Sequence, residues 1–72
     1  MTNYPNIEKS GFRAHEYVGY AGGRVFRITR VEEGKRTIGW RARAQIGSHR
    51  DGAVNLIIAP TLNSLSRQLS DA

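Results

Sequence analysis

Arginine alternates with apolar residues in the stretch TIGWRARAQI, residues 37–46. Ile38, Trp40 and Ala42 share one parity, which we assign to the core. Arg41 and Arg43 share the other. Because a β-strand points alternate side chains to opposite faces, this stretch predicts a strand with one apolar and one cationic side. Guanidinium groups are planar, permanently charged forks that suit phosphates and guanine edges, so the pattern predicts an anion-binding face with nucleic acid as its leading ligand.

Residues with catalytic side chains are few and poorly spaced for chemistry. His15 and His49 are the two imidazoles, and they do not form a metal-binding pair such as His-x-x-x-His. His15 and Glu16 are neighbours in a predicted strand, which places them on opposite faces. Ser48, His49 and Asp51 lie in one predicted turn, without an oxyanion site or a pocket. We therefore predict no enzyme activity, no catalytic residue, no metal and no cofactor.

The net charge points to a polyanionic ligand. The chain has 11 Lys and Arg residues against 6 Asp and Glu residues, and a formal net charge of +5. Nine of the basic residues and three of the acidic ones lie between residues 13 and 50, so this segment alone carries +6. Charge concentrated in this way is typical of nucleic-acid-binding domains, although a GC-rich genome or the demands of solubility produce similar compositions.

Length and composition predict one small domain. Its 72 residues bury a thin core, and the absence of cysteine excludes disulfides and thiol chemistry. No apolar run is long enough to span a membrane, and no secretion signal is visible, so we expect a cytoplasmic protein. Its small size is typical of proteins that phages and mobile elements encode. We expect residues 1–11 to be a loosely ordered arm and residues 12–72 to be a single domain.

The apolar pattern predicts an α+β fold. Strands are expected at about 12–20, 24–31, 36–46 and 54–59, with a three-residue hairpin loop EEG that pairs Phe26 with Trp40. A helix is expected at about 61–71, with Thr61 as its N-cap and leucines at i, i+3 and i+7. Because so short a helix must dock to be stable, the predicted fold is a small antiparallel three- to four-stranded β-meander with one C-terminal α-helix packed on one face.

This register assigns candidate nucleic-acid contacts to the face that the helix leaves open. Trp40 shares the parity of the core residues, so we expect it in the core, whereas Tyr17 is a candidate for base stacking. The predicted nucleic-acid-binding residues are Arg27, Arg41, Arg43, Thr29, Gln45, Arg13 and Tyr17. The predicted rim of steering charges consists of Arg24, Arg36 and Arg50.

Residues 24–72 are predicted to form a three-stranded antiparallel sheet with an exposed arginine-bearing face, followed by a helix. This order of elements is similar to that of the AP2 and integrase N-terminal DNA-binding domains. The resemblance implies DNA binding through the sheet and transfers no residue roles. Two alternatives stay open. The same face could bind an acidic protein surface, as in an inhibitor from a mobile element, and the edge strand NLIIA could pair two copies into a homodimer. Membrane binding is not expected, because the predicted helix carries one arginine, Arg67.

Overall fold

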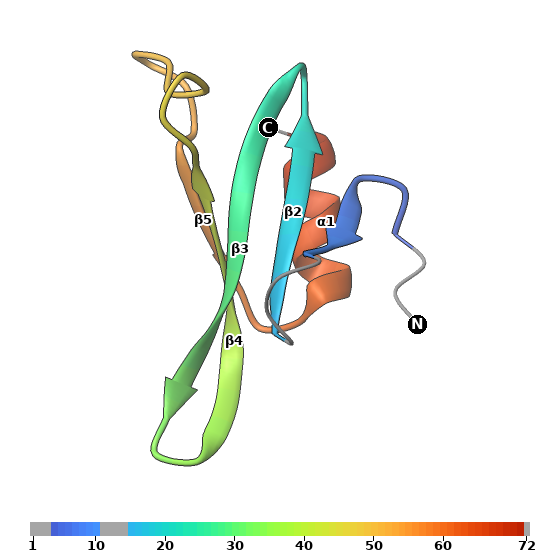
Figure 1. Cartoon of the computed structure of the whole chain (residues 1–72), viewed down its shortest axis with the longest axis vertical. Helices are drawn as coiled ribbons and strands as arrows, with labels where there is room; N and C mark the ends of the chain where they lie inside the picture. Colours follow the sequence, from blue (N-terminus) through green and yellow to red (C-terminus); the bar gives the residue numbers. More distant parts are fainter. Residues whose placement is uncertain (1–3, 11–14, 72) are drawn as a thin grey trace.

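The computed structural model describes residues 4–10 and 15–71, which form one antiparallel sheet covered by one helix (Figure 1). The strands are Ile7–Lys9 (β1), Glu16–Ala21 (β2), Arg24–Glu33 (β3), Arg36–Ala44 (β4) and Leu56–Ala59 (β5), and the helix is Leu62–Asp71 (α1). Neighbours in the sheet follow the chain, β1-β2-β3-β4-β5. The predicted α+β meander with a C-terminal helix is confirmed, but the described residues contain five strands rather than three to four.

The additional strand, β1, lies in the segment that we expected to be a loose arm. Ile7 is 3% exposed, and its backbone pairs with Gly19 of β2. Asn6 ties the same segment to the helix, since its Nδ2 donates to the backbone oxygen of Ser66 at 2.9 Å and Ser66 Oγ donates to Asn6 Oδ1 at 2.6 Å. A three-residue strand is too short to show a periodicity, which is why the sequence pattern does not reveal it.

The β3–β4 hairpin keeps the predicted faces but not the predicted register. We expected Phe26 to lie opposite Trp40, whereas its partner is Ala44, four positions further along β4. The turn consists of Gly34 and Lys35, and Gly34 has a φ of 63°, a conformation that glycine adopts without strain. Because the displacement is an even number of residues, the side chains from Phe26 to Thr29 and from Trp40 to Ala44 stay on the faces that were predicted for them.

A β-bulge accounts for part of this difference. The partner of Val31 is Gly39, but the partner of Glu32 is Thr37, so Ile38 is the extra residue on β4. An extra residue bends a strand and redirects its side chain. Ile38 is accordingly 50% exposed, and our prediction that it belongs to the core is wrong.

The core lies between α1 and the sheet. Thr61 caps the helix as predicted, since its Oγ1 accepts a hydrogen bond from the backbone nitrogen of Ser64 at 3.1 Å. Leu65 and Leu69 are completely buried, and α1 contacts β2, β4 and β5. No helix among the described residues is long and apolar enough to cross a membrane. The buried apolar residues are Ile7, Ala21, Phe26, Ile28, Ala42, Ala44, Ile57, Ala59, Leu65 and Leu69.

Candidate nucleic-acid interface

The sheet face opposite α1, which we call the open face, carries arginine on its two long strands. Arg27 of β3 lies directly opposite Arg43 of β4, and Thr29 of β3 lies opposite Arg41. All three arginines are exposed, because the residues between them point to the helix side and form the core. The alternation predicted from the sequence therefore places these four side chains together on one surface.

The three arginines differ in how far their charge is neutralised. Arg27 forms a two-pronged ion pair with Glu16 of β2, with Nε to Oε1 at 2.9 Å and Nη2 to Oε2 at 3.3 Å. Arg41 and Arg43 make no such ion pair with any residue in the described ranges. Arg41 and Arg43 therefore carry the uncompensated positive charge of the open face.

Two shallow hollows adjoin these arginines. The first has a volume of about 570 Å³. The second, on the β5 side, has a volume of about 310 Å³. Both hollows are lined by Arg41, Arg43 and His49, so these side chains lie between them. We call these three residues the arginine ridge. The remaining lining residues are Arg27, Thr29, Arg30, Ala44 and Ile46 for the first hollow, and Asn55 and Leu56 for the second.

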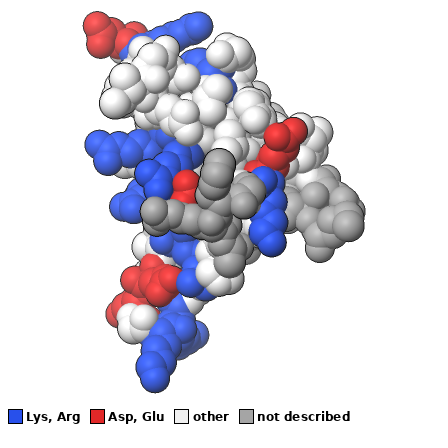
Figure 2. Space-filling model, in the orientation of Figure 1, with Lys and Arg blue, Asp and Glu red and all other residues white. Residues whose placement is uncertain are grey.

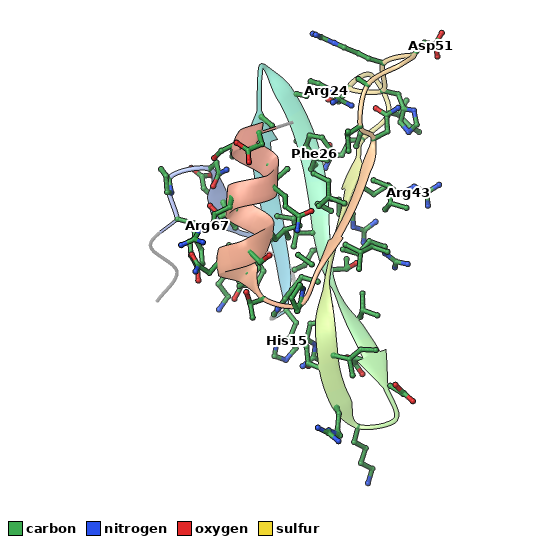
Figure 3. All side chains as sticks on the ribbon, turned by 180° about the vertical axis from the view of Figure 1, so that it is seen from behind. His15, Arg24, Phe26, Arg43, Asp51 and Arg67 are labelled. Atoms are coloured by element: carbon green, nitrogen blue, oxygen red, sulfur yellow. The ribbon has the colours of Figure 1, made fainter. Side chains whose placement is uncertain are left out.

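His49 is a member of this site that the sequence analysis did not assign. It is exposed and lies in the loop of residues 45–55, between β4 and β5. Its position beside Arg41 and Arg43 depends on how that loop folds back, which no local pattern reports. Figure 3 shows Arg43 projecting from the sheet on the side away from α1, and Figure 2 shows basic side chains along the side of the molecule where β4 and β5 lie.

Arg24, which we predicted to be a steering charge at the rim, has a different place. It is 6% exposed, and its guanidinium lies 5.0 Å from the centre of the Phe26 ring. Nε donates to the backbone oxygen of Ser48 and Nη1 to that of Val54, both at 2.8 Å, and Nη2 donates to Asn55 Oδ1. Arg24 is thus a buried clamp on the loop that carries His49, as its position between β3 and the loop in Figure 3 illustrates.

Tyr17 does not lie on the open face either. It is partly buried against the core on the helix side, and its ring meets that of Trp40 edge-on, with the ring centres 5.5 Å apart. Tyr17 pairs with Ile28, a core residue of β3, so its parity is that of the core. An edge-on pair of half-buried rings is a packing arrangement, and it leaves Tyr17 poorly placed to stack on a base beside the arginines.

The other predicted contacts are dispersed. Gln45 follows β4 and is exposed, with its backbone nitrogen bonded to the oxygen of Val25 at 3.0 Å. Arg36 lies at the far end of the β3–β4 hairpin, opposite Glu33, and Arg50 is exposed in the loop after β4. Arg13 lies outside the described residues.

Apolar side chains border the arginines on the β5 side. Leu56 lies opposite Arg43, and Ile58 lies opposite Arg41. These two apolar residues are 52% and 60% exposed. The open face therefore combines an arginine ridge with an apolar edge, a combination that an isolated strand pattern could not reveal.

The described residues contain no group of three or more histidine, aspartate or glutamate side chains placed to hold a metal ion. Comparison of the chain with protein-family models, with curated proteins and with solved structures found no significant match.

Proposed function

We propose that this chain binds nucleic acid, with DNA as the favoured ligand, through the open face of its sheet. Arg41 and Arg43 are the principal contacts, Arg27 and Thr29 support them, and the loop contributes His49. The observation that carries the proposal is the pair of exposed arginines beside Arg27 that form no ion pair within the described residues and lie between two hollows.

The arrangement of like charges favours an anionic ligand. Arg27 and Arg43 are direct cross-strand neighbours, an unfavourable arrangement for two cations that the ion pair of Arg27 with Glu16 relieves only in part. At a water-exposed surface this repulsion costs about 1 kcal/mol or less, so the fold tolerates it. A phosphate seated between the guanidinium groups converts the repulsion into charge-assisted hydrogen bonds.

The shape of the sheet favours duplex DNA over single strands. Pairing of β3 with β2 ends at Thr29, and pairing of β4 with β5 ends at Trp40, so beyond Arg41 and Arg43 the β3–β4 hairpin continues as a two-stranded ribbon with these arginines at its base. The major groove of B-form DNA, about 12 Å wide, admits such a ribbon, whereas that of A-form RNA is too narrow. Tyr20, which lies opposite Val25 and is 44% exposed, gives the described part of this face one aromatic ring, whereas proteins that bind single strands stack successive bases on several.

A binding titration with matched charge changes tests the proposal. Fluorescence anisotropy of a labelled DNA duplex of about 20 base pairs is measured at about 50 and about 200 mM salt. Arg41→Ala/Arg43→Ala is expected to weaken binding at least tenfold and to reduce the slope of log affinity against log salt by about 2. The control Lys9→Ala/Arg67→Ala removes the same charge from exposed residues of β1 and α1, outside both hollows and off the β3–β4 hairpin, and should change the affinity less than about threefold.

Equal losses in the two double variants would contradict a specific site, because net charge alone would then account for binding. Single-stranded DNA and RNA of the same length are titrated alongside, and tighter binding of either would overturn the preference for duplex DNA. If none of the three nucleic acids binds at the lower salt concentration, the proposal fails. An acidic protein surface is then the ligand to test on the same face.

A further inference from the structure

The strand β5 forms an edge of the sheet that lacks the usual protection. In the described part of the chain its single strand neighbour is β4. Its sequence, LIIA, contains no charged residue and no proline. The opposite edge, β1, has the sequence IEK, with two charges in three residues. Because charged and very short edge strands discourage pairing with another chain, β1 is protected and β5 is not.

The backbone of β5 has hydrogen-bonding groups directed outward. The backbone nitrogen of Ala44 donates to the oxygen of Asn55 at 2.8 Å, which makes these two residues a hydrogen-bonded pair. The direction of hydrogen bonding alternates along an antiparallel strand, so Ile57 also faces β4 and both Leu56 and Ile58 face outward. Figure 1 shows β5 at the outer edge of the sheet, and α1 packs on the core face of the sheet, where it contacts β2, β4 and β5. The helix therefore leaves this edge accessible to another strand.

The side chains at this edge favour an apolar partner. Leu56 and Ile58 are 52% and 60% exposed on the open face. Ile46 and Val54, in the loop that leads into β5, are exposed as well. Burial of apolar surface contributes about 25 cal/mol per Å², and exposed apolar residues grouped within a polar surface mark a site of association.

We infer that β5 pairs antiparallel with the β5 strand of a second copy of this chain, around a two-fold axis at Ile57. In this register Leu56 lies opposite the partner's Ile58, and Ile58 lies opposite the partner's Leu56. The outward N–H and C=O groups of both residues then pair across the axis. The edge is thus complementary to itself, as the interface of a two-fold dimer must be.

Charge explains why the copies meet at this edge and not face to face. Two copies that carry +5 each would bring their arginine ridges together if their open faces met. Joined at β5, the two β4 strands are three strand spacings apart, about 14 Å, which exceeds the Debye length of about 8 Å at physiological salt. The repulsion is then largely screened, and both ridges lie on one continuous face.

The size of the interface sets the expected affinity. A four-residue strand and the side chains around it form an interface at the small end of the range for specific complexes. We therefore expect a weak dimer, with a dissociation constant of about 100 μM.

Sedimentation velocity of the full chain without nucleic acid tests the inference. Between about 10 μM and about 1 mM, the weight-average mass of the wild type should rise from about 1.1 to about 1.8 times the monomer mass. Ile58→Lys should stay monomeric throughout, because a lysine at this edge opposes pairing. The matched control is Ile38→Lys, which changes an isoleucine of similar exposure, 50%, on the distal hairpin and should dimerise like the wild type.

Two results would overturn the inference: a wild type that remains monomeric over the whole range, or an Ile58→Lys variant that dimerises as well as Ile38→Lys. Circular dichroism spectra and melting temperatures of both variants must match those of the wild type. The test uses no DNA, so its outcome is independent of the proposed nucleic-acid binding.

Disulfide trapping checks the register. The chain contains no cysteine, so cross-links in Leu56→Cys/Ile58→Cys report the introduced pair alone. Hydrogen-bonded partners across an antiparallel pair have Cα atoms about 5.5 Å apart, within the range for a disulfide. With oxidised glutathione as oxidant, this variant should form covalent dimers, and the Glu8→Cys control at the β1 edge should not. Equal cross-linking of the two variants would contradict pairing through β5.

Discussion

Replacement of Arg24 by methionine tests whether a buried cation organises the loop that carries His49. Methionine keeps an unbranched stem that can pack against Phe26, but it removes the guanidinium. The change deprives Ser48 O and Val54 O of their donor, whereas Asn55 Oδ1 keeps a hydrogen bond from the backbone nitrogen of Arg50. It also removes the cation–π contact with Phe26. All of these contacts link β3 to the loop of residues 45–55, so the loss is local to one boundary of the proposed site.

The magnitude follows from the contacts. Each partly buried acceptor left without a donor costs about 1 kcal/mol, and the cation–π contact contributes about 0.5–1 kcal/mol. The substitution also removes the desolvation penalty of a buried charge whose described partners are neutral, and this offsets part of the loss. With two acceptors left without a donor, the expected loss in the free energy of unfolding is therefore about 2 kcal/mol. In a domain of this length that corresponds to a fall in melting temperature of about 8–16 °C.

Thermal unfolding followed by circular dichroism measures this loss, with Arg50→Met as the control. Arg50 lies in the same loop and its side chain is exposed, so its replacement should shift the melting temperature by no more than about 3 °C. If Arg24→Met melts within about 3 °C of Arg50→Met, the clamp does not exist. Arg24 would then behave as the exposed rim charge that its sequence context predicts.

Two further changes test the packing and the charge of the sheet. Gly39→Ala should lower the free energy of unfolding in urea by about 2 kcal/mol, since its Cβ would lie 2.9 Å from the backbone oxygen of Ala59. Gly19→Ala should cost less, because the clash at 2.8 Å is with the end of the Leu69 side chain; an equal or larger cost would contradict this reasoning. Glu16→Gln should free Arg27 and steepen the salt dependence of DNA binding by about 0.9 in the anisotropy titration, and an unchanged slope would show that Arg27 makes no phosphate contact.

Parity along the strands was the most predictable property of the site. Arg27, Arg41 and Arg43 could be assigned to one face because the direction of a side chain in a strand depends on its position alone. The helix was equally readable, since Thr61 and the spaced leucines signal its start and its buried side locally. An even displacement in register does not alter parity, so the arginine surface was predictable although the partner of Phe26 was not.

Properties that depend on several segments at once could not be predicted from the sequence. The bulge at Ile38 reflects the fit of two strands, and β1 gains its stability from Asn6 and Ser66, which are 60 positions apart. Arg24 reads as one more exposed cation until the loop folds over it and supplies three acceptors. Burial of such a charge is decided by the partners that surround it, and no local pattern reports them.

The amino-acid sequence alone determined the α+β class, the C-terminal helix and the existence of a cationic strand face, because each follows from local periodicity and capping. The tertiary structure alone decided which arginines stay uncompensated, that His49 joins Arg41 and Arg43, and that Leu56 and Ile58 form an apolar edge beside them. These relations arise where segments distant in the chain meet, and the energy of a charge or an apolar group there depends on its neighbours in space.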